Sequence, residues 1–182
     1  MNIKTRALHI LFLLSITLLA GCTGKPDNVK PVTGFELDRY LGKWYEIARL
    51  DHSFERGLQS ITAEYSMRED GGVHVLNRGY DVEDGEWTEA EGKAYFVDDP
   101  DQGHLKVSFF GPFYGSYIVF ELEPDYQYAF ISGPDTSYLW LLSRTPEVDQ
   151  KVIDSFVEQA SALGFDTSKL IYVDHSYPKT EQ

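Results

Sequence analysis

Hydrophobic and polar residues alternate in short runs along the chain from residue 35 to residue 143. Alternation with a period of two is typical of a strand that buries one face and exposes the other to water. The clearest example spans residues 61–68. In that run Ile61, Ala63, Tyr65 and Met67 fall on one face, and Thr62, Glu64, Ser66 and Arg68 fall on the other.

Eight short β-rich runs, some alternating in this way, are separated by clusters of Gly, Pro, Asp and Ser, which favour turns. Connections this short join antiparallel neighbours in a sheet. Runs 116–122 and 138–142 are apolar on both faces, which indicates that another element covers the outside of the sheet there. We expect strands over residues 44–50, 60–68, 73–80, 86–97, 104–110, 116–122, 126–132 and 138–143.

One helix is predicted after the last of these strands. Thr145 suits the N-cap, Pro146 suits the first helical position and Gly164 suits the end. A short further strand is predicted over residues 170–173. Because closure removes exposed sheet edges, the pattern predicts an all-β fold, an eight-stranded antiparallel up-and-down β-barrel with one C-terminal α-helix and a short extra strand. The apolar stripe of the helix consists of Val148, Val152, Phe156, Ala160 and Leu163.

The N-terminal residues are typical of a signal segment. Lys4 and Arg6 precede an apolar stretch over residues 10–20, and small residues lead to Cys22, the only cysteine of the chain. This segment resembles the lipobox of bacterial lipoproteins, which implies cleavage after residue 21 and lipidation of Cys22. The alternatives are an inert free thiol, or a plain secretory signal whose cysteine is incidental.

Composition divides the rest of the chain. Residues 22–34 are mostly polar and are expected to form a lipidated N-terminus and tether, followed by the barrel domain over 35–175 and a C-terminal tail over 176–182. Loss of Lys4 and Arg6 with the signal segment takes the formal charge from −13 to −15. This charge argues against a nucleic-acid partner. A single cysteine also excludes a disulfide within the chain, so aromatic-rich packing must stabilise the domain.

Two landmarks fall at the ends of the predicted barrel strands. The sequence Gly42-Lys43-Trp44 opens the first strand and Arg144 closes the eighth, so both lie at one end of the barrel. A guanidinium on the face of an indole would seal that floor. This pattern resembles the lipocalins over residues 35–173, and in particular the bacterial outer-membrane lipocalins. The resemblance is carried by residues 42–49, 54–58, 106–114 and 138–146, whereas residues 133–138 depart from the usual middle motif.

The resemblance implies a function. Lipocalins of this kind bind, store or transport small hydrophobic ligands, here fatty acids or lysophospholipids, for maintenance of the cell envelope. It implies anchoring in the outer membrane through N-terminal acyl chains such as palmitate, facing the periplasm. Thr23 after the cysteine is consistent with sorting to that membrane. The resemblance also suggests a homodimer. It implies no cofactor and no enzymatic activity.

Aromatic residues on strands near the open half are the candidates for the ligand-binding wall, and their alternative role is ordinary packing. Lys106 and Arg49 are candidates for an anionic headgroup, with a solvated outer face as the alternative. The wall candidates are Tyr65, Tyr95, Phe109, Tyr114, Tyr138 and Trp140.

Loops 51–59, 81–85, 111–115 and 133–137 are expected at the end of the barrel opposite Trp44. Phe54, Leu58, Phe113 and Tyr114 make two of these loops unusually apolar. They are candidates to line the mouth or to touch a bilayer, because exposed apolar loops are costly without a partner. The alternative is that they fold inward and plug the rim.

Catalytic and metal chemistry find little support. His52, His74, His104 and His175 have no metal-like spacing, and the acidic runs lack the pattern of a calcium loop. The rival hypothesis of an isomerase-type enzyme would need a general acid or base, for which Glu46 and His104 are the candidates. A third hypothesis is a structural lipoprotein whose barrel is filled by its own aromatic side chains.

Overall fold

The structure of this chain is a computed structural model that describes residues 24–178. The predicted signal segment 1–21, the predicted lipidation site Cys22 and the last residues of the predicted tail, 179–182, lie outside the described residues. Within the described part, no helix is long and apolar enough to cross a membrane.

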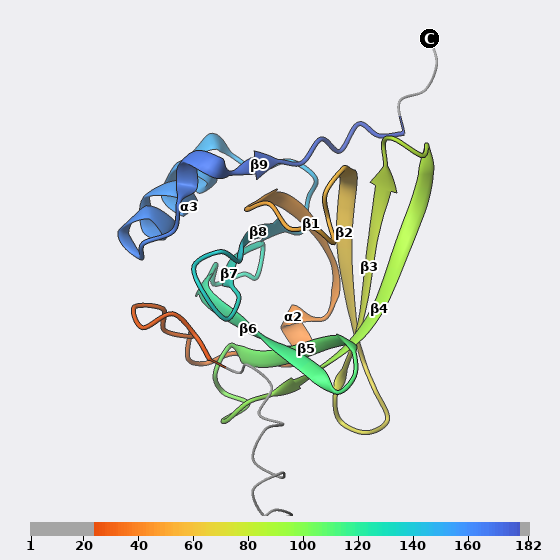
Figure 1. The fold of residues 1–182 in the computed structure, drawn as a ribbon. Coiled ribbons are helices and arrows are strands. Elements are labelled where there is room, and N and C mark those ends of the chain that lie inside the picture. Colours follow the sequence, from red (N-terminus) through yellow and green to blue (C-terminus); the bar gives the residue numbers. More distant parts are fainter. Residues whose placement is uncertain (1–23, 179–182) are drawn as a thin grey trace, which may run out of the picture.

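Nine strands form one sheet that closes into a barrel (Figure 1). Strands β2 to β8 each pair with the next strand along the chain in antiparallel orientation, and β8 pairs with β1. The ring closes because β1 also pairs with β2. The short strand β9 pairs with β1 outside the ring. The predicted eight-stranded barrel with an extra strand is therefore confirmed. The strands are β1 (Gly42–Arg49), β2 (Leu58–Met67), β3 (Val73–Asp81), β4 (Glu86–Phe96), β5 (His104–Phe110), β6 (Phe113–Leu122), β7 (Tyr128–Ser132), β8 (Leu139–Ser143) and β9 (Ile171–Tyr172).

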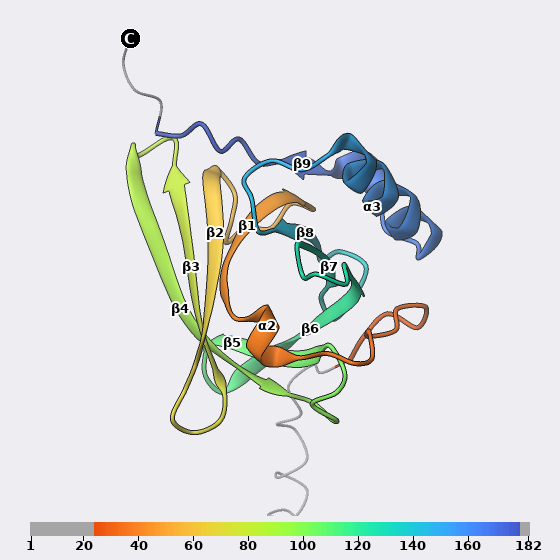
Figure 2. The ribbon, with the colours of Figure 1, turned by 180° about the vertical axis from the view of Figure 1, so that it is seen from behind.

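Two hydrophobic clusters lie on the two faces of the sheet. One fills part of the barrel interior and includes Trp44, Tyr65 and Ile131. The other lies outside the barrel, where helix α3 (Gln150–Ala162) covers β1, β6, β7 and β8 (Figures 1 and 2). Phe156 of α3 is fully buried there and packs edge-on against Phe130, with ring centroids 5.0 Å apart. The strands predicted to be apolar on both faces are the ones beneath this helix.

The start of α3 differs from the prediction. The N-cap is Asp149, whose carboxylate accepts a hydrogen bond from the backbone N–H of Lys151, and the helix begins at Gln150. Thr145 does not cap it, because its hydroxyl donates to the carbonyl of Glu147 and residues 145–149 are not helical. The predicted apolar stripe is confirmed, since its side chains pack in the outer cluster.

Residues 24–34 are held on the barrel rather than free of it. Val29 is fully buried in the outer cluster, and the N–H of Val32 donates to the carbonyl of Val119 in β6. The described part of the segment expected to be a tether is therefore in contact with the barrel. The chain then forms a short helix, α2 (Leu37–Tyr40), which the sequence pattern did not predict and which brings Tyr40 to the floor of the barrel.

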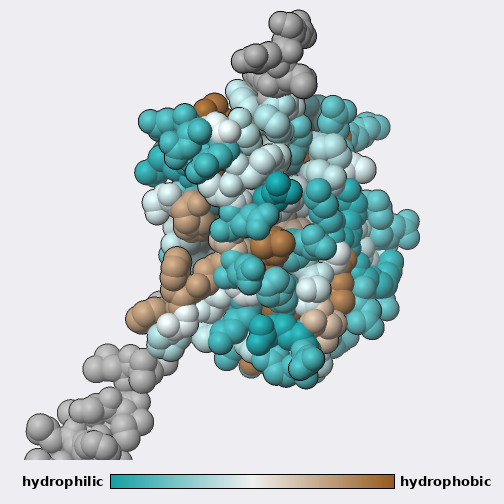
Figure 3. Space-filling view, turned by 90° about the vertical axis from the view of Figure 1, so that its right-hand side faces the viewer, coloured by the Kyte–Doolittle hydropathy of each residue, from teal (hydrophilic) through white to brown (hydrophobic). Residues whose placement is uncertain are grey.

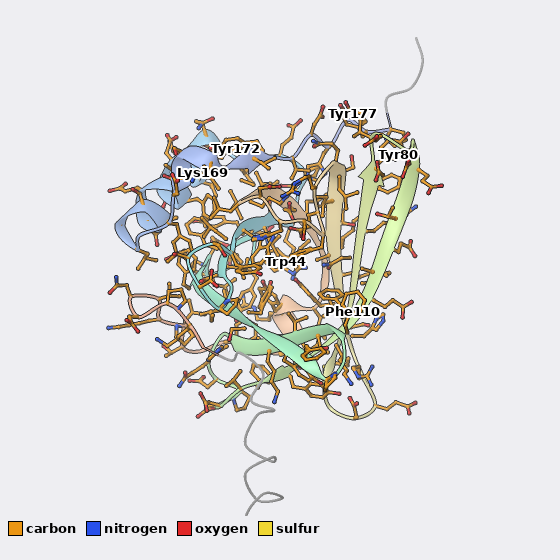
Figure 4. The ribbon with its side chains drawn as sticks, viewed as in Figure 1. Trp44, Tyr80, Phe110, Lys169, Tyr172 and Tyr177 are labelled. Carbon is orange, nitrogen blue, oxygen red and sulfur yellow. The ribbon has the colours of Figure 1, made fainter. Side chains whose placement is uncertain are left out.

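The C-terminal segment crosses the start of β2 after the 3₁₀ turn η1 (Thr167–Lys169) and β9. The Ser60 hydroxyl donates to the carbonyl of Tyr177, whose ring stacks on Tyr80 with centroids 6.0 Å apart (Figure 4). The outer face over β3 and β4 is mostly hydrophilic, with small separate hydrophobic areas (Figure 3). The described residues 24–178 thus hold the closed barrel together with both hydrophobic clusters.

Replacement of Phe156 by Ala tests the packing of α3 against the barrel. We expect the free energy of unfolding to fall by about 3–5 kcal/mol, because a fully buried ring is replaced by a cavity. Urea denaturation followed by circular dichroism measures this change. The exposed Glu158→Ala on the same helix is the control and should change stability by less than about 0.5 kcal/mol. A loss below about 1 kcal/mol for Phe156→Ala would show that the helix contributes little.

Candidate functional site

The barrel encloses a cavity of about 730 Å³. Its wall is mainly apolar and comes from β1 to β6, β8, α2 and two loops. A cavity of this size is within the range of about 300–1,000 Å³ that is common for small-molecule sites. The interior is therefore not filled by its own aromatic side chains, so the hypothesis of a filled barrel is wrong.

The floor of the barrel is closed by Arg144 and Trp44. The guanidinium carbon of Arg144 lies 3.8 Å from the centroid of the Trp44 ring, which is fully buried within the ring of strands (Figure 4). The guanidinium also donates hydrogen bonds to the carbonyls of Lys43, at 2.9 Å, and Arg39, at 2.7 Å. Gly42 has a φ of +89°, and a Cβ there would lie 3.6 Å from Arg144, so the turn into β1 favours glycine.

Three tyrosine hydroxyls meet above this floor. The hydroxyl of Tyr117 lies 2.6 Å from that of Tyr40 and 3.1 Å from that of Tyr65. All three side chains line the cavity. Burial raises the pKa of Tyr65 to about 12, and burial likewise raises the pKa of Tyr40 and Tyr117 well above their usual value. The floor of the cavity therefore presents neutral hydroxyl groups at physiological pH.

A buried ionic cluster lies farther up the wall. Arg49 Nη1 donates to Glu46 Oε1 at 3.0 Å, and Nη2 donates to the carbonyl of Glu55 at 2.8 Å. The indole N–H of Trp140 donates to Glu55 Oε2 at 3.2 Å. A register shift in the pairing of β1 with β8, between Glu46 and Ala48, places an extra residue in β1. In a regular strand, Glu46 and Arg49 would lie on opposite faces, because they are three residues apart. The extra residue places both side chains on the inner face, where they pair.

The electrostatics of this cluster favour the neutral form of one carboxyl. Burial raises the pKa of Glu46 well above its usual value, the Glu55 carboxyl raises it further, and Arg49 lowers it. Burial also raises the pKa of Glu55, against the lowering effect of Trp140 and Arg49. One guanidinium balances the charge of only one carboxylate, so the pair of carboxyls favours the protonated form of Glu46, whose pKa burial raises most.

The structure separates the six predicted wall residues into two groups. Tyr65, Phe109, Tyr138 and Trp140 line the cavity. Tyr95 and Tyr114 do not, and their prediction as wall residues is wrong.

Tyr95 and Tyr114 pack on each other on the outer face, with ring centroids 6.4 Å apart. The Tyr95 hydroxyl donates to Asp70. Its neighbour Ala94 takes the inward position of the alternation in β4. Both rings therefore follow the outer face of their strands.

The predicted headgroup cations also lie elsewhere. Lys106 pairs with Tyr95, and its ammonium lies over the Tyr114 ring at 5.4 Å, on the outer face. Arg49 is 1% exposed and is held behind Glu46 and Glu55, without lining the cavity. Neither cation faces the cavity, so the prediction of a headgroup site at these two residues is wrong.

The mouth carries exposed aromatic side chains. Phe54 and Phe113, both predicted there, line the cavity although they are 60% and 72% exposed. Phe110 joins them at 83% exposure and was not predicted (Figure 4). Leu58 is not part of the lining, because its side chain packs inward against Gly79, where a Cβ would lie 3.0 Å from it. The prediction of Leu58 as a mouth residue is therefore wrong.

The candidate acid and base are not brought together. Glu46 lines the cavity, whereas His104 begins β5 and does not. His52, to which the sequence analysis assigned no role, stacks between Phe54 and Tyr138, with ring centroids 5.2 Å and 4.3 Å away. Among residues 24–178 no three His, Cys, Asp or Glu side chains are placed to hold a metal ion.

Several residues that line the cavity were not predicted from the sequence. Tyr40 and Tyr117 carried no pattern apart from their apolar runs, and Glu55 was part of a recognised segment but had no assigned role. Glu55 contacts Arg49 and Trp140. Trp140 is far away in the sequence, and the direction of the Arg49 side chain depends on the irregular register of β1. No local sequence signal reports such a contact.

Replacement of Arg144 tests the floor. Arg144→Ala removes the ring contact and the hydrogen bonds to Lys43 and Arg39, and we expect a loss of about 2–4 kcal/mol in the free energy of unfolding. Arg144→Lys should recover only part of the lost stability, because an ammonium group lacks the planar arrangement of N–H donors of a guanidinium. Since Arg144 does not line the cavity, ligand affinity of the folded variants should stay within about threefold. Denaturant titration and a binding titration measure the two effects, and an unchanged stability would contradict the role of Arg144.

Comparison with known proteins agrees with this architecture. A family model of the lipocalin-like domain matches residues 35–175. The chain is 65% identical over 165 residues to outer membrane lipoprotein Blc of Vibrio cholerae, covering 90% of this chain and 96% of that protein. It is 51% identical over 158 residues to the protein of the same name from Escherichia coli K12, covering 86% and 89%.

A solved structure extends the likeness beyond bacteria. Insecticyanin from the tobacco hornworm Manduca sexta superposes with a TM-score of 0.68 at 26% identity, covering 85% of this chain and 88% of that one. The closed barrel and the helix after it agree with this neighbour. With the family match spanning most of its length, the chain belongs to the lipocalin-like domain family.

Proposed function

We propose that this protein is a membrane-anchored lipocalin that binds small hydrophobic ligands, of the fatty acid or lysophospholipid class, in its barrel. The observation that carries the proposal is the cavity of about 730 Å³, whose wall is mostly apolar. Removal of an acyl chain from water favours binding by roughly 25 cal/mol per Å² of apolar surface. The exposed rings of Phe54, Phe110 and Phe113 surround the mouth, where such a ligand would enter.

The proposed location is the outer membrane, with the barrel in the periplasm. The two bacterial relatives named above are called outer membrane lipoproteins, and the N-terminal sequence of this chain ends in a lipobox-like segment at Cys22. Because residues 24–34 pack on the barrel, an anchor at Cys22 would hold the domain close to the membrane surface. A homodimer is a further part of the proposal, supported by the exposed aromatic side chains at the mouth.

Ligand binding is tested with the soluble domain, residues 24–182, after delipidation and a check of folding by near-ultraviolet circular dichroism. A lysophospholipid and a fatty acid are titrated while tryptophan fluorescence is followed, because Trp140 lines the cavity. We expect saturable binding of one ligand per chain, which native mass spectrometry counts. A folded domain that binds neither lipid would contradict the proposal.

A pair of variants locates the ligand. Ala94 lines the cavity and is 5% exposed, so Ala94→Trp should fill part of the interior and weaken lipid binding by at least about tenfold. The control is Lys93→Trp, one position away in β4, which adds the same side chain outside the cavity lining. Equal binding by the two variants would place the ligand outside the barrel.

Anchoring is tested in cells. Cys22→Ala removes the only thiol that lipidation could use, so we expect the protein to leave the outer-membrane fraction. Membrane fractionation followed by immunoblotting measures its distribution, with the unaltered chain as the control. Retention of Cys22→Ala in the outer membrane would contradict the anchor.

A further inference from the structure

Three tyrosine side chains form a hydrogen-bonded cluster at the closed end of the cavity. The Tyr117 hydroxyl lies 2.6 Å from that of Tyr40 and 3.1 Å from that of Tyr65, and all three side chains line the cavity. Among residues 24–178, these hydroxyls form no other hydrogen bond. The cluster is therefore joined by two hydrogen bonds, both between its own members.

The cluster has more donors than hydrogen bonds. Three hydroxyl groups carry three O–H donors, and the two internal hydrogen bonds use two of them, whichever way the protons point. One O–H group is therefore left without an acceptor. Tyr40 and Tyr65 are only 3% and 8% exposed, so the cluster is withdrawn from bulk water. A buried donor without a partner costs free energy, which an oxygen atom of a ligand would recover.

The packing of the rings holds these hydroxyls in place. Tyr40 packs on Trp44 with ring centroids 4.7 Å apart and stacks on Tyr65 at 5.6 Å, and Tyr65 meets Tyr117 edge-on at 6.2 Å. Because burial raises the pKa of all three tyrosines, each keeps its proton at neutral pH. Arg144 does not line the cavity, and its three nitrogens donate to backbone carbonyls. The closed end thus offers one free O–H donor, together with the lone pairs of the tyrosine oxygens.

The two ends of the cavity suit different parts of a lipid. A charged headgroup fits the mouth, where water reaches it, because a single hydroxyl donor does not replace the hydration of a carboxylate. The acyl chain then follows the apolar wall towards the tyrosines. A methyl group at the end of the chain leaves the free donor unpaired, whereas a hydroxyl group accepts from it and donates to a tyrosine oxygen. The apolar wall includes Ala63, Val75, Ala94, Leu105 and Val107.

We propose that the tyrosine cluster is a subsite for a hydroxyl group at the far end of an acyl chain. The cavity therefore prefers fatty acids with a terminal hydroxyl (ω-hydroxy fatty acids) to those that end in a methyl group. The carboxylate of such a ligand stays at the mouth, between the exposed rings of Phe54, Phe110 and Phe113. This inference rests on the proposed function, because it places the acyl chain in the same cavity.

Pairs of fatty acids test the preference. Saturated acids from decanoate to hexadecanoate, each with a terminal methyl or a terminal hydroxyl, are titrated into the soluble domain by isothermal titration calorimetry at pH 7. At the chain length that reaches the tyrosines, the ω-hydroxy acid should bind at least about threefold more tightly than its methyl counterpart. At shorter lengths it should bind more weakly, because its hydroxyl is buried without a partner.

The outcomes separate the two proposals. Equal or weaker binding of the ω-hydroxy acid at every chain length would overturn the inference and leave the proposed function intact. No binding of any acid by the folded domain would overturn the proposed function as well.

A set of substitutions assigns the preference to the cluster. All three tyrosines are replaced by Phe, because any tyrosine left in place keeps a free O–H group. Phe retains the stacked rings, so the triple variant should fold, which near-ultraviolet circular dichroism checks. It should bind the ω-hydroxy acid at least about tenfold more weakly than the methyl acid. Tyr138→Phe removes a hydroxyl elsewhere in the lining and should keep the preference. A preference that persists in the triple variant would overturn the assignment.

The direction of the chain is measured without altering the cluster. Trp140→Phe leaves Trp44 at the floor and Trp87 outside the cavity lining. A bromine atom quenches tryptophan fluorescence at short range, so dodecanoate brominated at the end of the chain should quench more strongly than dodecanoate brominated beside the carboxylate. Stronger quenching by the second acid would place the headgroup at the floor and overturn the inference.

Discussion

Closure of the sheet at β1 is the constraint on which the rest of the structure depends. This strand pairs with β2 on one side and with β8 on the other, and a register shift between Glu46 and Ala48 lets it do both. The shift turns Ile47 and Ala48 toward the helix and Glu46 and Arg49 toward the interior. A single irregularity therefore supplies both the apolar surface that α3 covers and the polar cluster of the cavity.

The interior is divided along the barrel axis. At the floor, Trp44 and Arg144 close the barrel, and the Tyr117 hydroxyl is hydrogen-bonded to those of Tyr40 and Tyr65. Above them the ionic cluster of Arg49 is held by hydrogen bonds from several elements. Buried polar groups must be paired, because an unpaired one costs the full desolvation penalty. The floor groups pair with one another, while Glu46 and Glu55 of the upper cluster line the cavity.

The two faces of the sheet are packed differently. The outer cluster beneath α3 is densely packed, with Phe130 and Phe156 fully buried. Segment 24–34 extends this cluster through Val29, so the polar sequence before the barrel is part of the folded domain. The inner face leaves space instead, since Ala63, Ala90 and Ala94 contribute small side chains to the cavity lining.

The sequence determined the architecture and its landmarks. Alternation, turn residues and the helical stripe require no knowledge of distant contacts, so the strands, the barrel and the pairing of Trp44 with Arg144 could be inferred from them. The start of α3 could not, because Asp149 and Thr145 are both residue types that cap helices well, and the structure has Asp149 as the N-cap. The faces taken by Tyr95, Tyr114 and Arg49 were also decided by tertiary structure. Period-two counting locates a residue in a strand, but the register with the neighbouring strand decides whether its side chain faces ligand or solvent.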